Sequence, residues 1–390
     1  MTMLKKRLMT PGPTEVGEAA RLVAASSHAH HRSAEFKAVM RDALDGLAWL
    51  FDTDDVVVVT GSGTAGMEAA MRTTIGAADR VAVVTGGKFA ERWRDIARCI
   101  TPNVEVFALE WGEGADPQSF AEWLEGQPPF QAMVAVASET STGVLHPVAQ
   151  LCAAFRAHSP EGVTLIDGIT AVGAADLSMR RDGFDVLVSG SQKAFGLPPG
   201  AAFVGMSARA WARADEVDAP SYYLDLRRER GQLREGSSAF TPNVPVVLGL
   251  NAVLEGWRAA GREALFHHAA QLSAAAHAGA RAAGLAFFGS GARSPALTSV
   301  VVGDAETVRA RLRTHYGVAV AGGQNALKDR ILRVGHIGPI DVFDMCSTWT
   351  AIACALADAG HDCVPADVAA ATVAAVSDGL RAQPSHLFRP

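Results

Sequence analysis

Short runs of consecutive apolar residues recur through the first half of the chain, and each is followed by a turn of small residues and a helical pattern. Five such runs lie at residues 54–59, 80–84, 130–138, 163–170 and 185–194. Their apolar residues do not alternate with polar ones, which is typical of parallel strands covered by helices on both faces of a sheet. The alternation of strand and helix therefore predicts an α/β layered fold.

The pattern changes after about residue 245. A long helical stretch, expected to connect two domains, precedes an apolar run at 296–303, a helix and two short strands, and helices fill the remainder. A chain of 390 residues also exceeds what one hydrophobic core usually holds. We therefore predict a large domain over residues 21–265, a smaller α+β domain over 266–390, and an N-terminal segment, 1–20, that packs on the smaller domain or on the site.

Charge and hydropathy argue against several classes of partner. The formal net charge of −6 offers no electrostatic footprint for nucleic acid or an anionic membrane. The sequence has no apolar run long enough for a membrane span, and its basic first residues lack the apolar region of a signal peptide. The five cysteines are scattered without a CxxC pair, which predicts neither disulfides nor a zinc cluster. We expect a soluble cytoplasmic protein without a metal.

Two ionisable residues directly follow apolar runs, where ligands of such a sheet collect. Lys193 lies in the small-residue loop SGSQKA, and burial there would lower its pKa and make it a competent amine for a Schiff base. Asp167 ends the run VTLID and could pair with the pyridinium nitrogen of a cofactor. The alternatives are a solvated loop lysine, and an aspartate that caps a helix or forms a buried salt bridge.

A glycine-rich loop and a late arginine could bind anions. The loop TGSGTAG at 60–66 separates a strand from a helix, so backbone N–H groups and the helix dipole could hold a phosphate. Gly61, Gly63 and Gly66 superficially match a dinucleotide fingerprint, but no acidic residue follows the next strand, which disfavours a nicotinamide site. Arg333 in ILRVGHIG could grip a carboxylate, the alternative being a surface salt bridge.

Nine segments in order carry a resemblance to a known family. They are MTPGPTEV, HHRSAEF, GSGTAGMEAA, GGKFAERW, ETSTGVLHP, DGITAVGA, SGSQKAFGLPPG, FTPNVP and GGQNALKDRILRVGHIG. Through these segments, from about residue 8 to 345, the chain resembles the class V aminotransferases, which depend on pyridoxal phosphate (PLP) and have fold type I; the alanine–glyoxylate, serine–glyoxylate and serine–pyruvate group is the most similar. The resemblance implies a large domain with a mostly parallel, seven-stranded sheet between helices and a smaller α+β C-terminal domain.

The resemblance also implies roles for individual residues. Lys193 would form the Schiff base with PLP and act as the general base, and Asp167 would pair with the pyridine nitrogen. Arg333 would bind the substrate α-carboxylate beside a pocket wall formed by Pro11, Gly12 and Pro13. The other cofactor-binding residues would be Ser62, Gly63, Thr64 and Gln192 at the phosphate, Phe89 and Ile169 on the two ring faces, and Thr140 near the ring oxygen.

The family pattern also implies a homodimer whose sites lie at the subunit interface. Thr241 would reach the phosphate bound by the neighbouring subunit. Some members have a tyrosine three residues earlier, where this chain has Ser238, so Tyr222 or Tyr223 could rebuild that contact. Phe89 stands where the family often has tryptophan, which keeps an aromatic ring.

The implied reaction moves an amino group from a small amino acid, alanine or serine, to a small 2-oxo acid, glyoxylate or pyruvate. One alternative is a class V transaminase for ureidoglycine, 2-aminoethylphosphonate or pyridoxamine. A PLP-dependent lyase, either a desulfurase or an aldolase-like member of the same superfamily, is a further alternative. A desulfurase needs a mobile cysteine, whereas Cys346 and Cys354 lie in a helical pattern. A nicotinamide-dependent oxidoreductase and a non-catalytic binding module are the alternatives of other classes.

The histidines add little to the predicted site. His28, His30 and His31 cluster locally, but no cysteine or carboxylate completes a metal site, so we expect a structural role or a place at the rim of the site. His336 follows Arg333 by three residues and is expected to line the pocket.

Overall fold

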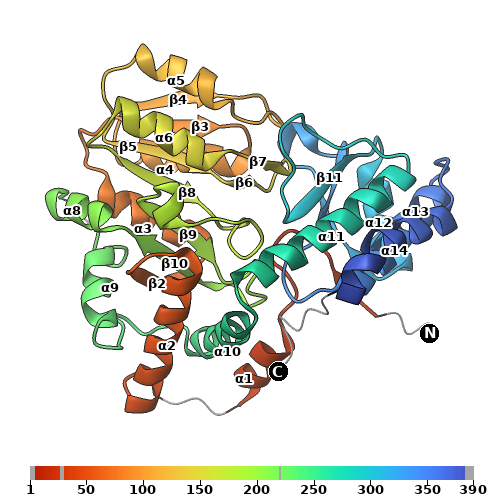
Figure 1. The fold of residues 1–390 in the computed structure, drawn as a ribbon, viewed down its shortest axis with the longest axis horizontal. Helices are drawn as coiled ribbons and strands as arrows, with labels where there is room; N and C mark the ends of the chain where they lie inside the picture. The colour runs from red at the N-terminus through yellow and green to blue at the C-terminus, as the bar shows by residue number, and fades with distance from the viewer. Residues whose placement is uncertain (1–4, 27–29, 219–220, 383–390) are drawn as a thin grey trace.

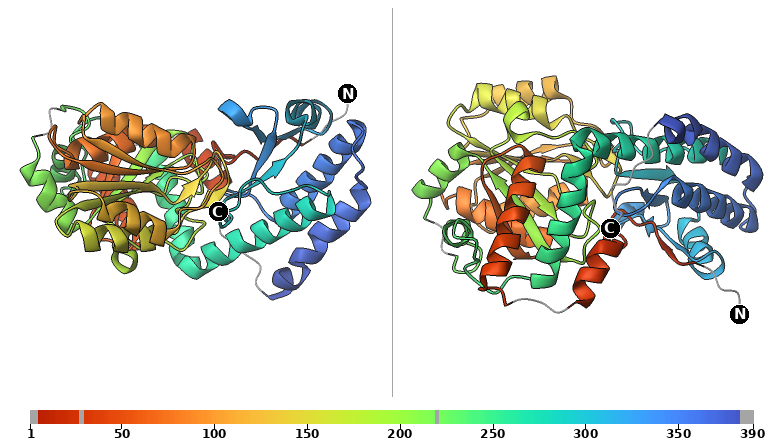
Figure 2. Two further views of the ribbon diagram at one scale, coloured as in Figure 1. Left: turned by 90° about the horizontal axis from the view of Figure 1, so that it is seen from above. Right: turned by 60° about the horizontal axis from the view of Figure 1, so that its bottom comes forward.

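The computed structural model describes residues 5–26, 30–218 and 221–382. A seven-stranded sheet with helices on both faces forms its larger part, and a second α+β unit lies beside it (Figures 1 and 2). The predicted α/β fold with a smaller α+β unit is confirmed. The limits at residues 20/21 and 265/266 stay predictions. His28 lies outside the described residues.

The large sheet is mostly parallel, as predicted. Only β10 runs antiparallel to its neighbours, β2 and β9. The strand order is β2 (Val56–Gly61), β10 (Gly200–Met206), β9 (Val186–Gly190), β8 (Val163–Asp167), β5 (Ala132–Val136), β3 (Val81–Thr85) and β4 (Val104–Ala108). The five predicted apolar runs overlap β2, β3, β5, β8 and β9, and β2 and β3 extend one or two residues beyond them.

Consecutive residues of each central strand enter two different cores, which explains why these strands are apolar throughout. Met133 and Ala135 of β5 join one cluster of buried side chains, whereas Ala132 and Val134 join the other. Both faces are therefore removed from water, and a polar residue on either face would lose its hydration.

Helices cover the two faces of this sheet. One core receives side chains from α5 (Pro117–Glu125), α6 (Val148–His158) and α10 (Val244–Ala260). The other receives them from α3 (Gly63–Thr74), α4 (Lys88–Arg98), α8 (Ala208–Glu216) and α9 (Leu226–Leu233), while α2 (Ala34–Phe51) contributes to both. Two short helices, α1 (Glu18–Ala25) and α7 (Met179–Asp182), and the hairpin of β6 (Ser138–Glu139) with β7 (Val144–Leu145) complete this part.

The α+β unit has its own antiparallel sheet and core. Its strand order is β11 (Leu297–Val301), β14 (Ile331–Gly335) and β13 (Ala321–Gly322). It also contains α12 (Ala305–His315), η1 (Asn325–Leu327), α13 (Val342–Asp358) and α14 (Pro365–Ala382). At the other end of the chain, β1 (Arg7–Leu8) pairs in parallel with β12 (Val318–Ala319), so the N-terminal segment packs on this unit.

The predicted connecting stretch is two helices rather than one. Helix α10 ends at Gly261, whose φ of 87° lies in the left-handed region that favours glycine, and α11 (Arg262–Ala282) starts there. Leu265 belongs to a core of the large sheet, whereas Leu272 belongs to the core of the α+β unit. Helix α11 therefore joins the two parts, as Figure 2 shows.

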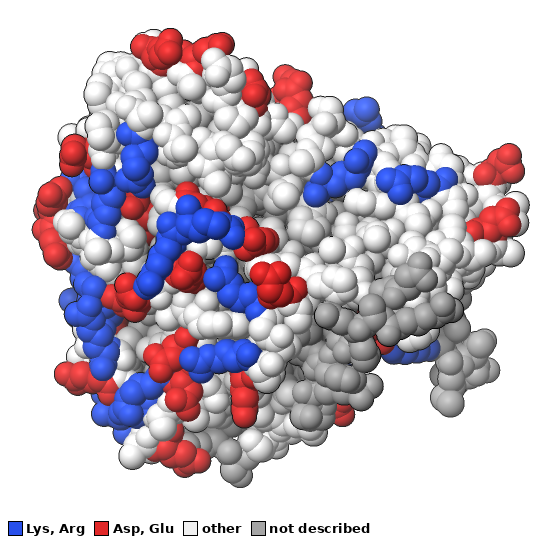
Figure 3. All heavy atoms as spheres, in the orientation of Figure 1, with Lys and Arg blue, Asp and Glu red and all other residues white. Residues whose placement is uncertain are grey.

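Charges are mixed on the surface. On the face drawn in Figure 3, Lys and Arg lie interspersed with Asp and Glu over the larger part of the molecule. Among the described residues, no helix combines the length and apolar character needed to cross a bilayer.

Candidate active site

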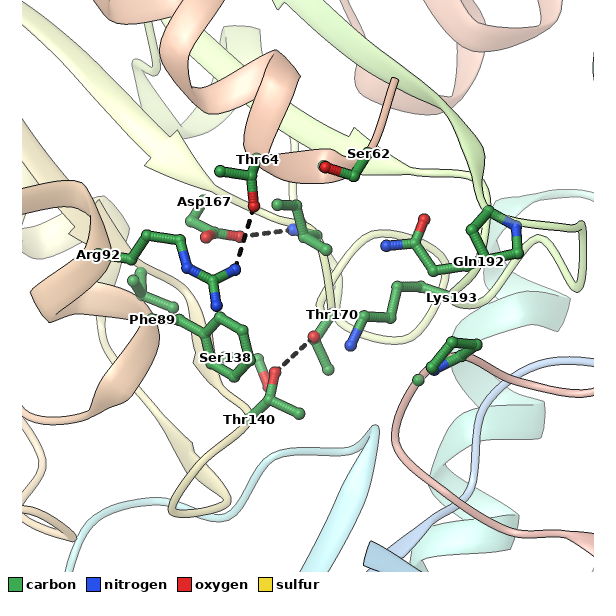
Figure 4. A pocket seen from close by; sticks show the side chains of 16 residues that line it. Ser62, Thr64, Phe89, Arg92, Ser138, Thr140, Asp167, Thr170, Gln192 and Lys193 are labelled. Atoms are coloured by element: carbon green, nitrogen blue, oxygen red, sulfur yellow. Dashed lines mark hydrogen bonds between the residues drawn. The ribbon is translucent and has the colours of Figure 1, made fainter. Parts of the chain in front are cut away.

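A cavity of about 240 Å³ lies beyond the carboxyl ends of β2, β5, β8 and β9 (Figure 4). In an open α/β sheet this is the edge where ligands bind. The lining contains eleven of the fourteen residues assigned to the site from the sequence, counting Pro13. The sixteen lining residues are Gly12, Pro13, Ser62, Gly63, Thr64, Phe89, Arg92, Val136, Ser138, Thr140, Asp167, Ile169, Thr170, Gln192, Lys193 and Pro199.

Lys193 is buried and points into this cavity, which rules out a solvated loop lysine. Its Nζ donates a hydrogen bond of 2.7 Å to the carbonyl of Pro11. Burial lowers the pKa of the Lys193 amine to about 8, because the charged form loses its hydration. Gly12 has a φ of 127°, and a Cβ there would overlap Lys193 Nζ, so glycine is required for both conformation and space.

Asp167 is buried at the end of β8 and receives two hydrogen bonds. Its Oδ1 accepts from the backbone N–H of Ile169 and its Oδ2 from the Trp93 indole, each at 2.8 Å. Burial raises the pKa of the Asp167 carboxyl, while these two donors act in the opposite direction. Among the described residues Asp167 neither caps a helix nor forms an ion pair.

The turn between β2 and α3 has free donors for an anion. Ser62 is the N-cap of α3, but its side chain makes no capping hydrogen bond, and the first N–H groups of a helix have no partner within it. A Cβ on Gly63 would lie 2.8 Å from Ile169 Cδ1, so a larger residue there would have to displace the end of the Ile169 side chain. Oε1 of Gln192, which also lines the cavity, is buried and has no hydrogen-bond partner among the described residues.

Helix α4 supplies one wall of the cavity. The Phe89 ring lies 6.0 Å from Lys193 Nζ and 5.0 Å from the Arg92 guanidinium, measured to the ring centroid. Nη1 of Arg92 also donates to Thr64 Oγ1 at 3.1 Å, which links α4 to the start of α3.

Arg333 is buried beside the cavity, so the surface salt-bridge interpretation is wrong. Its Nη1 donates to the Thr140 carbonyl and its Nε to the Gly322 carbonyl, both at 2.8 Å. Within the described part of the chain, no carboxylate lies at ion-pair distance from Arg333. Burial lowers the pKa of this guanidinium to about 10. The Thr140 hydroxyl shares a 2.6 Å hydrogen bond with the Thr170 hydroxyl.

Two predicted residues lie elsewhere. His336 does not line the cavity, contrary to our expectation; it is buried, with Nε2 3.0 Å from Thr298 Oγ1. Thr241 is exposed and outside the cavity of its own chain. Nearby, Ser238 Oγ donates to the Phe240 carbonyl and the Tyr223 hydroxyl donates to the Thr60 carbonyl.

Sequence analysis missed several residues of the site. Trp93 and Arg92 follow Phe89 by four and three positions, a helical spacing that could have placed them on the same face of α4. The other missed residues are Val136, Ser138, Glu139, Thr170 and Pro199. Where the structure describes the chain, no group of three or more His, Cys, Asp or Glu side chains is placed to hold a metal ion.

Residues 17–336 match the family model of the class V aminotransferases, described as Aminotransferase class-V. The chain belongs to this family. As an aminotransferase of this class, it has the fold that the resemblance implied, and both predictions are confirmed. The lysine at the end of one strand and the aspartate at the end of the next therefore lie in a fold whose members use PLP.

Three similar proteins illustrate this relationship. The soluble hydrogenase 42 kDa subunit of Anabaena cylindrica is 34% identical, over 92% of this chain and 95% of that protein. The L-aspartate–glyoxylate aminotransferase of Paracoccus denitrificans is 29% identical, over 85% and 86%. The solved structure of a subgroup IV aspartate aminotransferase from Thermus thermophilus superposes with a TM-score of 0.84 at 31% identity, over 90% of this chain and 99% of that one.

The cavity of this aminotransferase fits PLP on its own features. The unpartnered Gln192 Oε1 and the uncapped start of α3 offer contacts for the phosphate side. Lys193 is a buried amine of lowered pKa, and Asp167 is a buried carboxylate without a cationic partner among the described residues. Burial of an amine and of a carboxylate remains costly beside their hydrogen bonds to Pro11, Trp93 and Ile169, and contacts with a bound cofactor would offset that cost.

Proposed function

We propose that this protein transfers the amino group of a small amino acid, alanine or serine, to a small 2-oxo acid, glyoxylate or pyruvate. PLP linked to Lys193 would serve as the carrier. The observation that supports this most is the placement of Lys193 and Asp167 in one cavity, beside the uncapped start of α3.

The cofactor would be held by residues of several elements. When bound, PLP supplies an electron sink for the pair left behind when a proton leaves the substrate Cα. Asp167 would accept a hydrogen bond from the pyridinium nitrogen, and Phe89 and Ile169 would pack on the ring. The remaining contacts would come from Ser62, Gly63, Thr64 and Gln192 at the phosphate and from Thr140 near the ring oxygen.

Lys193 would both link the cofactor and move the proton. With a pKa of about 8, its amine is uncharged in a useful fraction of molecules near neutral pH. The free Nζ would take the proton from the substrate Cα and return it to the cofactor carbon. The Pro11 carbonyl, which accepts a hydrogen bond from Nζ, would keep the amine directed into the cavity.

The cavity favours a small substrate with one carboxylate. About 240 Å³ must hold both cofactor and substrate, and Pro13, Val136 and Pro199 line part of the wall. Arg333 would bind the α-carboxylate, since no carboxylate of the described chain neutralises it. Gly12 and Pro11 would bound the same region.

We infer that a second copy completes each site. Thr241 is exposed and outside its own cavity, which suits a residue that reaches the phosphate of a neighbouring subunit. A homodimer is therefore the proposed assembly, and the cytoplasm its proposed location.

The family match leaves the nicotinamide-dependent alternative without support. Within the lyase alternative, a desulfurase would need a mobile cysteine in the cavity, and Cys346 and Cys354 lie on α13, away from the residues that line it. An aldolase-like lyase needs no such cysteine, and the spectroscopic experiment below separates it from a transaminase. Transaminases for ureidoglycine, 2-aminoethylphosphonate or pyridoxamine remain candidates, because the same cofactor residues would serve them.

The decisive experiment is visible absorption spectroscopy of the purified protein loaded with PLP. Addition of L-alanine or L-serine without an acceptor should convert the yellow band to that of the aminated cofactor. L-aspartate belongs in the series because two relatives bear it in their names. A band unchanged by these amino acids would direct the search to the other donors or to a lyase, and a protein that takes up no PLP would overturn the proposal.

A further inference from the structure

The first turn of α4 is capped by a distant loop instead of by its own N-cap residue. Gly87 occupies the N-cap and has no side chain to offer. Ser141 Oγ accepts from the Lys88 N–H at 2.9 Å, and Glu139 Oε2 accepts from the N–H groups of Phe89 and Ala90 at 3.1 and 3.0 Å. The first three N–H groups of the helix are thus satisfied from one segment.

The two capping side chains, Glu139 and Ser141, are hydrogen-bonded to each other. Glu139 Oε1 accepts from both the hydroxyl and the backbone N–H of Ser141, at 2.5 and 2.9 Å. A Cβ on Gly87 would overlap the Glu139 side chain, so glycine is the residue that leaves room for this carboxylate. Glu139 is fully buried, where only several donors and a helix N-terminus can support its charge.

Helix α4 carries three side chains into the active site. Phe89 and Arg92 line the cavity, and Trp93 donates to Asp167. The register and direction of this helix therefore decide where the aromatic wall lies and whether the Asp167 carboxylate receives its indole donor.

The segment that caps α4, residues 138–141, also contributes side chains to the lining of the cavity. Residues 138–141 alternate: Ser138 and Thr140 line the cavity, whereas Glu139 and Ser141 bind α4. The Thr140 carbonyl accepts from Arg333. One buried carboxylate thus connects the helix that contacts Asp167 with the segment that holds the proposed substrate arginine.

We infer that Glu139 is a positioning residue of the transamination site, which acts by fixing the first turn of α4 so that Phe89 and Trp93 meet the cofactor and Asp167. The inference rests on the proposed function. Burial raises the pKa of the Glu139 carboxyl, and when this carboxyl is ionised its charge opposes the lowering of the Lys193 and Arg333 pKa values by burial. Glu139 itself does not line the cavity, so it would touch neither cofactor nor substrate.

The test compares four variants with the wild type. Glu139→Ala removes all acceptors, Glu139→Gln keeps one, and Ser141→Ala removes the hydroxyl that receives the Lys88 N–H. Asp116→Asn is the matched control, because Asp116 is the exposed N-cap of α5, remote from the cavity, and its Oδ2 accepts from Ser119 N–H at 3.0 Å. Thermal unfolding of each variant shows whether it folds.

The readouts are the PLP dissociation constant, the circular dichroism of the visible cofactor band, and amide hydrogen exchange at Phe89 and Ala90 in cofactor-free protein. We expect Glu139→Ala to weaken PLP binding about tenfold or more and to speed exchange at both amides, since buried N–H groups lose their acceptors. Glu139→Gln should recover part of the loss, Ser141→Ala should show a smaller one, and Asp116→Asn should match the wild type.

The inference and the proposed function fail in different ways. A wild-type protein that gives no cofactor band would overturn the proposed function itself. A wild type that binds PLP normally, with folded Glu139 variants that keep its dissociation constant and band dichroism, would show that Glu139 is only a structural cap. If Glu139→Ala does not fold, Glu139→Gln and Ser141→Ala decide the question by the same measurements.

Discussion

The indole Nε1 of Trp93 donates a 2.8 Å hydrogen bond to Oδ2 of Asp167, and both side chains are buried. The bond connects α4 to the end of β8, two elements that both contribute residues to the cavity lining. Burial disfavours the charged carboxylate, so a neutral donor that binds its charged form has a direct effect on its protonation. Trp93 would thereby help Asp167 stay ionised opposite a pyridine nitrogen.

Replacement of Trp93 by phenylalanine should weaken PLP binding without removing the apolar packing of the ring. A hydrogen bond to a charged group contributes about 1.5–3 kcal/mol, so we expect the PLP dissociation constant to rise by about one order of magnitude or more. The measurement is titration of cofactor-free protein with PLP, followed by visible absorbance.

Trp111→Phe is the matched control for this experiment. Trp111 also donates its indole N–H to a carboxylate, Glu91 Oε1 at 3.0 Å, but it does not line the cavity. Equal PLP affinities of Trp93→Phe and the wild type would contradict the role given to this hydrogen bond.

Lys193→Ala should abolish turnover. The variant loses both the amine that would link PLP and the base that would move the Cα proton, so we expect kcat to fall by about a thousandfold or more. Steady-state transamination assays measure this loss, and Lys328→Ala, which removes an exposed lysine, should keep wild-type activity. Appreciable turnover by Lys193→Ala would contradict the role of Lys193 as the Schiff-base residue and general base.

Capture of PLP by the cofactor-free protein should depend on pH through the Lys193 amine. Burial lowers the pKa of this amine to about 8, and only the uncharged amine attacks an aldehyde. The rate should therefore rise with pH and level off above about pH 8, whereas an ordinary lysine would keep gaining until about pH 10. Stopped-flow absorbance records the rate. The reference amine is lysine acetylated on its α-amino group, which leaves only the side-chain amine free to react. A rate that keeps rising with the same slope above pH 9 would show that the pKa of the Lys193 amine is not lowered.

The parts of the site that sequence analysis predicted are those marked locally in the chain. Asp167 ends an apolar strand, Lys193 follows one closely, and Gly63 lies at a recognisable turn between a strand and a helix. Glu139 also follows an apolar run, but nothing local to Glu139 or Trp93 reveals its role, because each acts through a partner that folding brings close. Trp93 is separated from Asp167 by 74 positions, and Glu139 from Ala90 by 49.

The same reasoning explains the errors in detail. His336 was expected in the cavity from its spacing to Arg333, but the two side chains differ in surroundings: the Arg333 guanidinium bonds to Thr140, and the His336 ring to Thr298. The long helical stretch predicted as one connector contains Gly261, whose positive φ ends one helix where the next begins. Periodicity alone does not reveal either arrangement.

A shared site makes a prediction about mixed dimers. Thr241→Ala should lower activity in the homodimer, because a phosphate contact from the neighbouring subunit is lost. In a heterodimer of Thr241→Ala with Lys193→Ala, one site would combine an intact Lys193 with an intact Thr241 from the other chain. Activity per Lys193 should then return to the wild-type level.

Co-expression of two differently tagged chains allows this heterodimer to be isolated. Activity per Lys193 equal to that of the Thr241→Ala homodimer would show that Thr241 does not act between subunits.

Arg333→Lys should raise the KM for the amino-acid donor by about 10- to 100-fold and change kcat little. Lysine keeps the charge but loses the planar fork that binds a carboxylate in two places, and that interaction is made equally in the bound substrate and the transition state. Arg309→Lys is the control, since Arg309 pairs with Glu306 on α12 and does not line the cavity.

A substrate without a carboxylate, ethylamine in place of alanine, separates loss of the carboxylate contact from a general loss of activity in the variant. Wild type and Arg333→Lys should handle ethylamine equally poorly, because neither can use the missing group. A variant that loses as much activity toward ethylamine as toward alanine would instead assign Arg333 to holding the Thr140 and Gly322 carbonyls in place.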